Sequence, residues 1–169
     1  GEDYNSLLIG TSSTGTQVKK QNYAELYIRW FQFGAFCPTF RTHGTRKHNE
    51  VWSYGEKAEQ ILVKYLKLRY SLMPYIYSLA YQTTRTGAPF MRALWMDFPE
   101  EECARLQDEF MFGPAFLIAP VVECGQTQRR VYLPQGADWV DYWTGRHYRG
   151  GRWILAQAQM DCIPIFVRA

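Results

Sequence analysis

One stretch constrains the fold of this chain more than any other, residues 22–44 with the sequence NYAELYIRWFQFGAFCPTFRTHG. Leu26, Trp30, Phe33 and Cys37 recur there at the spacing of one helix face. Apolar residues also occupy the other sides of the same segment. A helix that is apolar all round is stable only where protein covers it, so we expect this helix to be heavily buried.

Polar residues and a proline set the ends of this predicted helix. Asn22 is a good N-cap, and the Glu25 carboxylate is placed to reach back to the free amides of the first turn. Pro38 lacks an N–H group and disfavours helical backbone at the residue before it. The helix therefore ends there, and the chain continues into a loop that carries Arg41 and His43.

The segment ELYIRWFQFGAFCPTFRTHG resembles the late-barrel segment of glycoside hydrolase family 31, the retaining α-glucosidases and α-xylosidases, and its form most resembles the bacterial α-xylosidases. The resemblance covers residues 22–169. It implies that His43 hydrogen-bonds hydroxyls of the sugar in the −1 subsite and that Arg41 lines the same site. From the residues alone, a histidine with a structural role in the loop is the commoner case. An arginine that is buried and holds loop carbonyls would give the same sequence pattern as an Arg41 that lines a sugar site.

A second, longer helix is predicted after this loop. Residues 50–55, EVWSYG, resemble a Glu-Pro-Trp-x-Phe-Gly element of the family, with Val51 in place of the proline. Apolar residues then recur every three or four positions over residues 61–80, which predicts a wide apolar helix face. Pro74 lies within this pattern and predicts a kink, and Gly87 predicts the end of the helix.

Residues 89–98, PFMRALWMDF, are nearly all apolar, as expected for a strand covered on both faces. Helix, loop, helix and buried strand are typical of a parallel α/β unit, and the resemblance makes this strand the last of the barrel. From Phe110 onward, short β-rich segments are separated by turn residues, which predicts an antiparallel β-sandwich.

We therefore predict an α/β fold followed by an all-β fold, namely the C-terminal part of a (β/α)8 barrel and part of an antiparallel β-sandwich domain. Residues 1–107 form the end of the catalytic barrel, and residues 108–169 form the proximal C-terminal β-sandwich domain. Residues 1–21 are not matched to the family, because its Asp-Ile-Gly-Gly-Phe type motif has no clear counterpart there.

Retaining glycosidases need two carboxyl groups about 5 to 5.5 Å apart. In the family both are aspartates, in Trp-x-Asp-Met-Asn-Glu and Gly-Asp-Asn type motifs of earlier barrel strands, and this sequence contains neither motif. We assign no catalytic residue, because Asp97 is placed to cap a strand-to-helix junction and Asp141 lies in a strand of the second domain. No other aspartate of the chain is assigned the role of the missing nucleophile or acid/base.

The resemblance implies a piece of an enzyme that hydrolyses α-xylosidic or α-glucosidic bonds in oligosaccharides without a metal or an organic cofactor. Its partners would be the oligosaccharide and the missing upstream half of the barrel. Because it lacks both aspartates, the chain alone is predicted to be inactive. A non-catalytic carbohydrate-binding or purely structural module is the alternative, since that module would also lack the acid pair.

Charge and hydropathy exclude two classes of partner. The net charge is only +3, and the basic pairs are interspersed with acidic residues, whereas nucleic-acid binding requires a clustered basic face. No signal-like segment opens the chain, and no apolar run approaches the ~20 residues of a membrane span. We expect a soluble chain with no membrane partner and assign no compartment.

Three short patterns argue against other sites. His43 and His48 lack the HExxH arrangement of a zinc site, so no metal ligand is predicted. Gly10 and Gly15 have the glycine spacing of a phosphate-binding loop, but Thr16 stands where that loop requires lysine. The four cysteines form no CxxC pair and are predicted to be buried free thiols.

Overall fold

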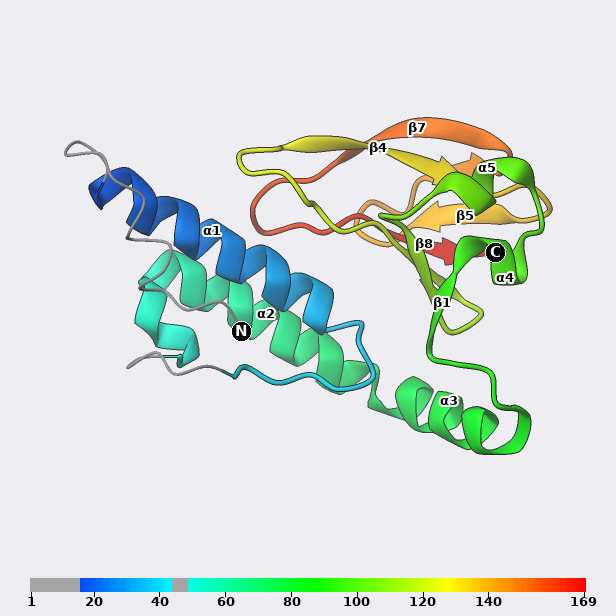
Figure 1. The fold of residues 1–169 in the computed structure, drawn as a ribbon, viewed down its shortest axis with the longest axis horizontal. Coiled ribbons are helices and arrows are strands. Elements are labelled where there is room, and N and C mark those ends of the chain that lie inside the picture. The colour runs from blue at the N-terminus through cyan, green and yellow to red at the C-terminus, as the bar shows by residue number, and fades with distance from the viewer. Residues whose placement is uncertain (1–15, 44–48) are drawn as a thin grey trace.

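The computed structural model of the chain describes residues 16–43 and 49–169 (Figure 1). Along these residues helices come first and antiparallel strands second, as the predicted fold class requires. Figure 1 shows α1 (Thr16–Gly34) and α2 (Glu56–Ser71) side by side, with the strands at the upper right of the view. A short 3-10 helix, Val51–Tyr54, immediately precedes α2.

Helix α1 is longer than the sequence predicted. It begins at Thr16, so Asn22 lies inside it and the predicted N-cap is wrong. The lysines and glutamines before Asn22 are good helix formers, which lets the helix extend toward its N-terminus. The Glu25 carboxylate bonds instead to the β-rich part, where it accepts hydrogen bonds from the Gly125 N–H at 2.8 Å and the Cys124 thiol at 3.2 Å.

The predicted kinked helix is two helices, because helical structure stops after α2 and resumes in α3 (Met73–Thr86). The residue between them, Leu72, keeps nearly helical angles, φ −84° and ψ 0°. Pro74 lies in the first turn of α3, where its missing N–H costs no hydrogen bond. The helix ends at Gly87, as predicted, with a left-handed φ of 76° and an N–H bond to the Thr83 carbonyl at 2.8 Å.

Residues 89–98 do not form a buried barrel strand, so this prediction is wrong. Only β1 (Met91–Ala93) is extended, and Leu94–Asp97 forms one helical turn, α4. β1 pairs antiparallel with β2 (Phe110–Phe112), and Trp95 is 54% exposed. A short apolar run has no periodicity that separates a strand covered on both faces from a half-buried edge strand.

The β-rich part contains two antiparallel sheets. A six-stranded sheet has the order β1-β2-β3-β8-β5-β6, and β4 and β7 form a two-stranded sheet. β3 pairs with the C-terminal strand β8, which in turn pairs with β5, so that both ends of this part meet in one sheet. The remaining elements are α5 (Glu101–Arg105), β3 (Phe116–Ile118), β4 (Gln128–Leu133), β5 (Asp138–Asp141), β6 (His147–Arg149), β7 (Arg152–Gln157) and β8 (Ile165–Arg168).

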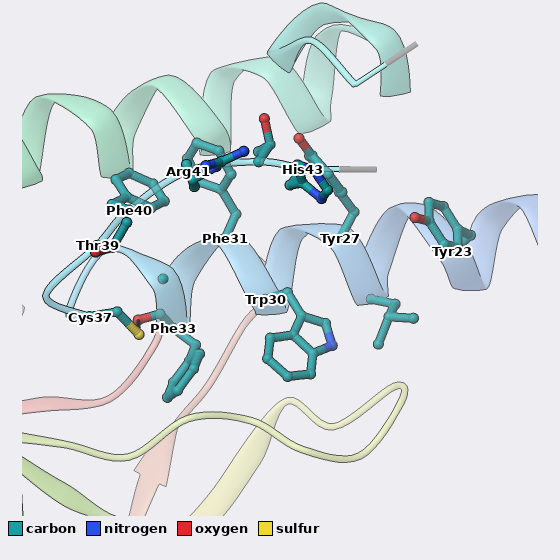
Figure 2. A pocket seen from close by; sticks show the side chains of 13 residues that line it. Tyr23, Tyr27, Trp30, Phe31, Phe33, Cys37, Thr39, Phe40, Arg41 and His43 are labelled. Atoms are coloured by element: carbon teal, nitrogen blue, oxygen red, sulfur yellow. Dashed lines mark hydrogen bonds between the residues drawn. The ribbon is translucent and has the colours of Figure 1, made fainter. Parts of the chain in front are cut away.

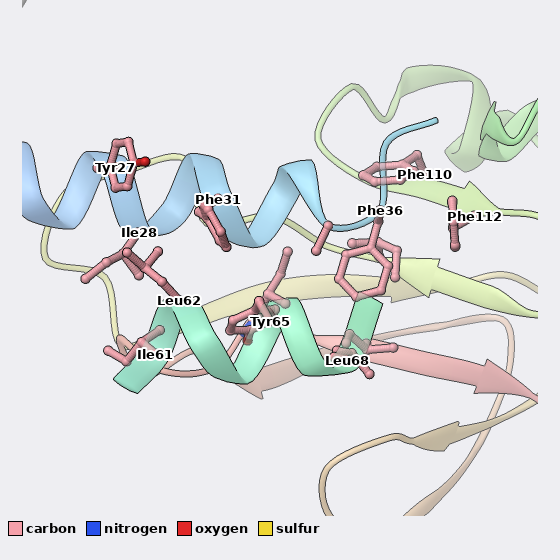
Figure 3. Packing of buried hydrophobic residues seen from close by; sticks show 14 of the residues in the cluster. Tyr27, Ile28, Phe31, Phe36, Ile61, Leu62, Tyr65, Leu68, Phe110 and Phe112 are labelled. Atoms are coloured by element: carbon pink, nitrogen blue, oxygen red, sulfur yellow. The ribbon is translucent and has the colours of Figure 1, made fainter. Parts of the chain in front are cut away.

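Two apolar clusters make up the core. The first fills the space between α1 and α2 and continues to the sheet, where Phe36 packs edge-on against Phe112 with ring centroids 5.8 Å apart (Figure 3). Leu62 and Tyr65 of α2 are fully buried in it. The second cluster lies within the β-rich part around Trp139, whose indole N–H donates to the Pro134 carbonyl at 3.0 Å. The shared first cluster joins the helices to the sheet.

A buried arginine also ties α1 to the β-rich part. Arg29 is only 7% exposed, and its guanidinium group donates hydrogen bonds to four backbone carbonyls that lie far along the chain. Burial lowers its pKa, and no carboxylate lies within ion-pair distance among the described residues. The four carbonyls belong to Gln126 (3.0 Å), Ala158 (2.8 Å), Gln159 (3.0 Å) and Cys162 (3.2 Å).

A second buried charged group lies within the β-rich part. The side chain of Glu109 is fully buried, accepts a hydrogen bond from the Tyr132 N–H at 3.0 Å, and lies 3.6 Å from the Arg129 guanidinium. Arg129 makes a shorter ion pair, 2.8 Å, with Asp108. Burial outweighs these contacts and raises the pKa of Glu109 to about 8.

Two sequence predictions about exposure need correction. Trp30 is 64% exposed, so α1 is not covered on all sides. All four cysteines are free, but only Cys103 is buried, while Cys124 is exposed. Within the described ranges, no helix is both long enough and apolar enough to cross a membrane.

Candidate functional site

The candidate site is formed by the loop that follows α1. Helical hydrogen bonding tightens at the end of α1, where Cys37 donates to the Gly34 carbonyl at 3.0 Å, and Pro38 then stops it. The chain turns and runs back along α1, so that the Phe40 ring packs on Phe31 with centroids 4.7 Å apart. A Cβ atom on Gly34 would lie 3.1 Å from the Phe40 ring, so a larger residue there would require the ring to shift by a few tenths of an ångström.

A pocket of about 520 Å³ lies against this loop and α1 (Figure 2). Aromatic side chains from both elements line it, and Arg41, Thr42 and His43 line it from the loop. All three of these polar residues are exposed. Aromatic faces beside hydrogen-bonding groups suit a ligand that is apolar on its faces and polar at its edges. The aromatic residues are Tyr23, Tyr27, Trp30, Phe31, Phe33 and Phe40.

The structure brings the two residues predicted from sequence, Arg41 and His43, to the same pocket. Their function there stays a prediction. The arginine that holds loop carbonyls is a different residue, Arg69 of α2, which sequence reasoning did not single out. Arg41 itself is exposed, so the buried structural role considered for it from sequence belongs to Arg69.

Tyr27 of α1 ties the far end of the loop to the helix. Its hydroxyl group donates to the backbone carbonyl of Asn49 at 2.8 Å. Burial raises the pKa of this hydroxyl, and a hydrogen bond with Thr42 offsets part of the shift. The loop is therefore bound to α1 on both sides of residues 44–48, which lie outside the described residues. His48, for which no metal-binding role was predicted, is one of these residues.

Three aspartates of the described chain have structural partners. Asp97 pairs with Arg92 at 3.2 Å rather than capping a helix, and Asp161 pairs with Lys64 at 3.3 Å. Asp141, at the end of β5, accepts hydrogen bonds from the backbone N–H groups of Trp143 and Thr144, both at 2.9 Å. Within the described residues, no carboxylate lines the pocket.

The sequence predicted neither a metal site nor a phosphate-binding loop. No group of three or more His, Cys, Asp or Glu side chains in residues 16–43 and 49–169 is placed to hold a metal ion. Gly10 and Gly15 lie outside the described residues, and His147 is exposed in β6. The chemistry of the described pocket is therefore hydrogen bonding from Arg41, Thr42 and His43 above an aromatic surface.

Comparison with known families gives two matches that together span most of the chain. Residues 5–79 match the model described as the glycosyl hydrolases family 31 TIM-barrel domain, so the prediction that residues 1–21 have no match to the family is wrong for residues 5–21. Residues 87–169 match the glycosyl hydrolase family 31 C-terminal domain. The pocket lies in the first of these regions, and the two-sheet part lies in the second.

Two curated relatives share over two fifths of the aligned residues with this chain. An α-xylosidase from Saccharolobus solfataricus is 44% identical over 148 residues, which is 87% of this chain and 20% of the relative. An α-glucosidase 2 from Bacillus thermoamyloliquefaciens is 45% identical over 148 residues, 85% of this chain and 19% of the relative. The chain thus spans about a fifth of the length of these relatives.

Two solved structures have a fold similar to that of this chain. An α-xylosidase from a soil metagenome, in complex with xylose, matches with a TM-score of 0.85 and 41% identity, over 87% of this chain and 25% of that chain. An α-xylosidase from Xanthomonas citri matches with a TM-score of 0.87 and 42% identity, over 92% of this chain and 17% of that chain.

Proposed function

Because the chain belongs to glycosyl hydrolase family 31, we propose that it supplies the sugar-binding loop and the adjoining β domain of a retaining α-glycosidase. The bonds that this enzyme hydrolyses are α-xylosidic or α-glucosidic, as the names of the relatives suggest. The extents of the two family matches and the pairing of β1 with β2 favour a boundary between residues 79 and 87, earlier than the one predicted between residues 107 and 108. The observation that carries the proposal is the meeting of Arg41 and His43 at one aromatic pocket.

The chemistry of these side chains suits a sugar. The imidazole of His43 offers one donor and one acceptor when neutral, which matches a hydroxyl group that both donates and accepts. The guanidinium group of Arg41 offers further donors, and Trp30 and Phe31 present apolar faces to the same pocket. A hydrogen bond to a hydroxyl next to the reacting carbon strengthens as charge develops in the transition state, and so contributes to the rate.

The reaction itself needs two carboxyl groups from outside the described pocket. In a retaining mechanism one carboxylate attacks the anomeric carbon while the other, as an acid, protonates the departing oxygen. Water then releases the sugar with that second group acting as a base. We assign both groups to the upstream part of the barrel, so His43 and Arg41 hold the sugar while other residues carry out bond cleavage.

A segment exchange tests this function. The part of the soil-metagenome α-xylosidase that matches this chain is replaced by this chain, and hydrolysis of aryl α-xylosides and α-glucosides is measured. We expect turnover, and we expect His43→Ala to lower kcat/KM about 10- to 100-fold, since a lost hydrogen bond to a desolvated hydroxyl costs ~1–3 kcal/mol. His147→Ala, at an exposed histidine of β6, is the matched control and should leave kcat/KM unchanged.

The outcomes separate two functions. An active hybrid whose rate is insensitive to His43→Ala would show that His43 does not bind the sugar. A non-catalytic carbohydrate-binding module is favoured only by the lack of a carboxylate in the described lining of the pocket. Binding of xylose by the 169-residue chain, together with a hybrid that never turns over substrate, would support that second function.

A further inference from the structure

Arg69 makes contacts that neither the sequence motifs nor the pocket lining explain. It lies in α2 and is 9% exposed, yet no carboxylate pairs with it among the described residues. Its guanidinium group donates instead to three backbone carbonyls, those of Ala35 at 2.9 Å, Cys37 at 2.7 Å and Pro38 at 3.0 Å. All three belong to the segment that joins α1 to the candidate sugar-binding loop.

These carbonyls lie just beyond α1, which ends at Gly34, in the turn that leads to the loop. The carbonyls of the last helical turn already accept hydrogen bonds from the N–H groups of Ala35, Phe36 and Cys37. Arg69 therefore bonds the carbonyls of the turn that follows the helix, next to Pro38, which has no N–H group to offer. A planar guanidinium group reaches several such oxygens at once and in fixed directions, which an ammonium group does not. Burial lowers the pKa of Arg69, but carbonyl oxygens at the negative end of a helix favour its charged form.

The anchored segment leads directly to the pocket. Pro38 stands three residues before Arg41, and Phe40 between them is held against Phe31 and Gly34. Arg69 does not line the pocket. Its hydrogen bonds therefore fix where the loop leaves the helix, and the loop in turn fixes where Arg41 and His43 meet the pocket (Figure 2).

We propose that Arg69 is a positioning residue, which holds the exit of α1 so that Arg41 and His43 are placed for the sugar. The proposal rests on the proposed function of this loop. Misplacement of a binding group by about 1 Å lowers an enzymatic rate by up to ~100-fold. Loss of the anchor should therefore act on the rate through the loop residues.

The first test is kinetic and uses the active hybrid enzyme. Arg69→Lys keeps the charge but loses the fork of donors, and should lower kcat about tenfold or more, with a smaller change in KM. In the His43→Ala background the same substitution should cost clearly less than tenfold, because one of the two residues that it positions is already absent. This lack of additivity is the result that a merely structural arginine would not give.

Arg29→Lys is the matched control. Arg29 is a second buried arginine that bonds only to neutral groups, mostly backbone carbonyls, but its carbonyls belong to the β-rich part and it does not line the pocket. Its substitution should lower the thermal midpoint as much as Arg69→Lys does. Its effect on kcat should be the same with and without His43. If Arg69→Lys is equally independent of His43, Arg69 is structural and the proposal is overturned.

A second test does not depend on activity. Trypsin cleaves after Arg41, and the cleavage rate in the folded 169-residue chain reports how often this loop opens. Arg69→Met should raise the rate at the Arg41–Thr42 bond about fivefold or more above the rate in Arg29→Met. Equal rates in the two variants would overturn the anchoring role. If cleavage rises but His43→Ala leaves the hybrid fully active, the anchor stands and the proposed sugar-binding function fails.

Discussion

Gly113, in the turn between β2 and β3, is expected to tolerate no side chain. Its φ is 61°, and a Cβ atom there would lie 2.2 Å from the Tyr75 hydroxyl oxygen and 2.6 Å from a methyl group of Leu79. The Tyr75 hydroxyl donates to the Phe112 carbonyl at 2.9 Å and accepts from the Ala115 N–H at 3.2 Å. The turn thus joins α3 to the sheet through one tyrosine.

The cost of Gly113→Ala follows from these contacts. Left-handed backbone costs a residue with a Cβ atom roughly 1–2 kcal/mol. Displacement of the Tyr75 hydroxyl removes two hydrogen bonds, each worth about 0.5–1.5 kcal/mol net. The free energy of unfolding should therefore fall by roughly 2–5 kcal/mol in total. Urea denaturation of the chain, followed by tryptophan fluorescence, measures this loss.

A second glycine separates the cost of the left-handed backbone from the cost of the lost hydrogen bonds. Gly145 has a similar φ of 70°, but a Cβ atom there has no neighbour within 4 Å. Gly145→Ala should cost only the backbone term, about 1–2 kcal/mol. In the Gly113→Ala background, Tyr75→Phe should restore part of the stability, because it removes the clashing oxygen. Equal losses at the two glycines, or no recovery with Tyr75→Phe, would refute the assignment of the cost to this contact.

Three further predictions concern the free energy of unfolding. The folded chain keeps on Glu109 a proton that the unfolded chain releases above the ordinary carboxyl pKa of 4.5, so stability should fall as pH rises from there to about 8. In the Glu109→Gln variant, the free energy of unfolding from urea titrations should fall by roughly 3 to 4 kcal/mol less between about pH 5 and pH 8 than in the parent protein. If the two proteins instead show parallel plots of unfolding free energy against pH, Arg129 keeps the Glu109 carboxylate charged. Arg29→Met should lower stability by about 3 kcal/mol or more in urea titrations, because four carbonyls lose a charged donor, and a loss below about 1 kcal/mol would contradict that role. Asp141→Ala should lower it by about 1 kcal/mol through the two turn amides that lose their acceptor, and an unchanged thermal midpoint would argue against this.

Sequence patterns predicted the parts of the fold whose cause is local. Gly87 ends α3 because glycine adopts a left-handed φ without strain. α1 ends at Gly34, a few residues before the predicted end, and Pro38 stops the tightened turn that follows because it lacks a donor. The turn residues between the β-rich segments separate strands that the structure contains. The loop with Arg41 and His43 was found from its motif, and the structure places both residues at one pocket.

Contacts between residues far apart in the chain left no comparable pattern in the sequence. Arg29 and Arg69 are held by backbone carbonyls, and a carbonyl group leaves no mark on the sequence because every residue has one. The edge position of β1 depends on its pairing with β2, which its apolar composition does not encode. The helix start before Asn22 depended on the propensity of the preceding residues, which outweighed the capping pattern.

The contacts of Arg29 also set an order of events during synthesis. Its partners Gln126 and Cys162 follow it by 97 and 133 residues. At a translation rate of about 5–20 residues per second, α1 exists for roughly 5 to 27 s before these carbonyls have been made. During that interval the arginine stays hydrated and the face of α1 around it remains uncovered. The helix that carries the candidate sugar-binding loop therefore reaches its final packing only after the chain has been made through Cys162.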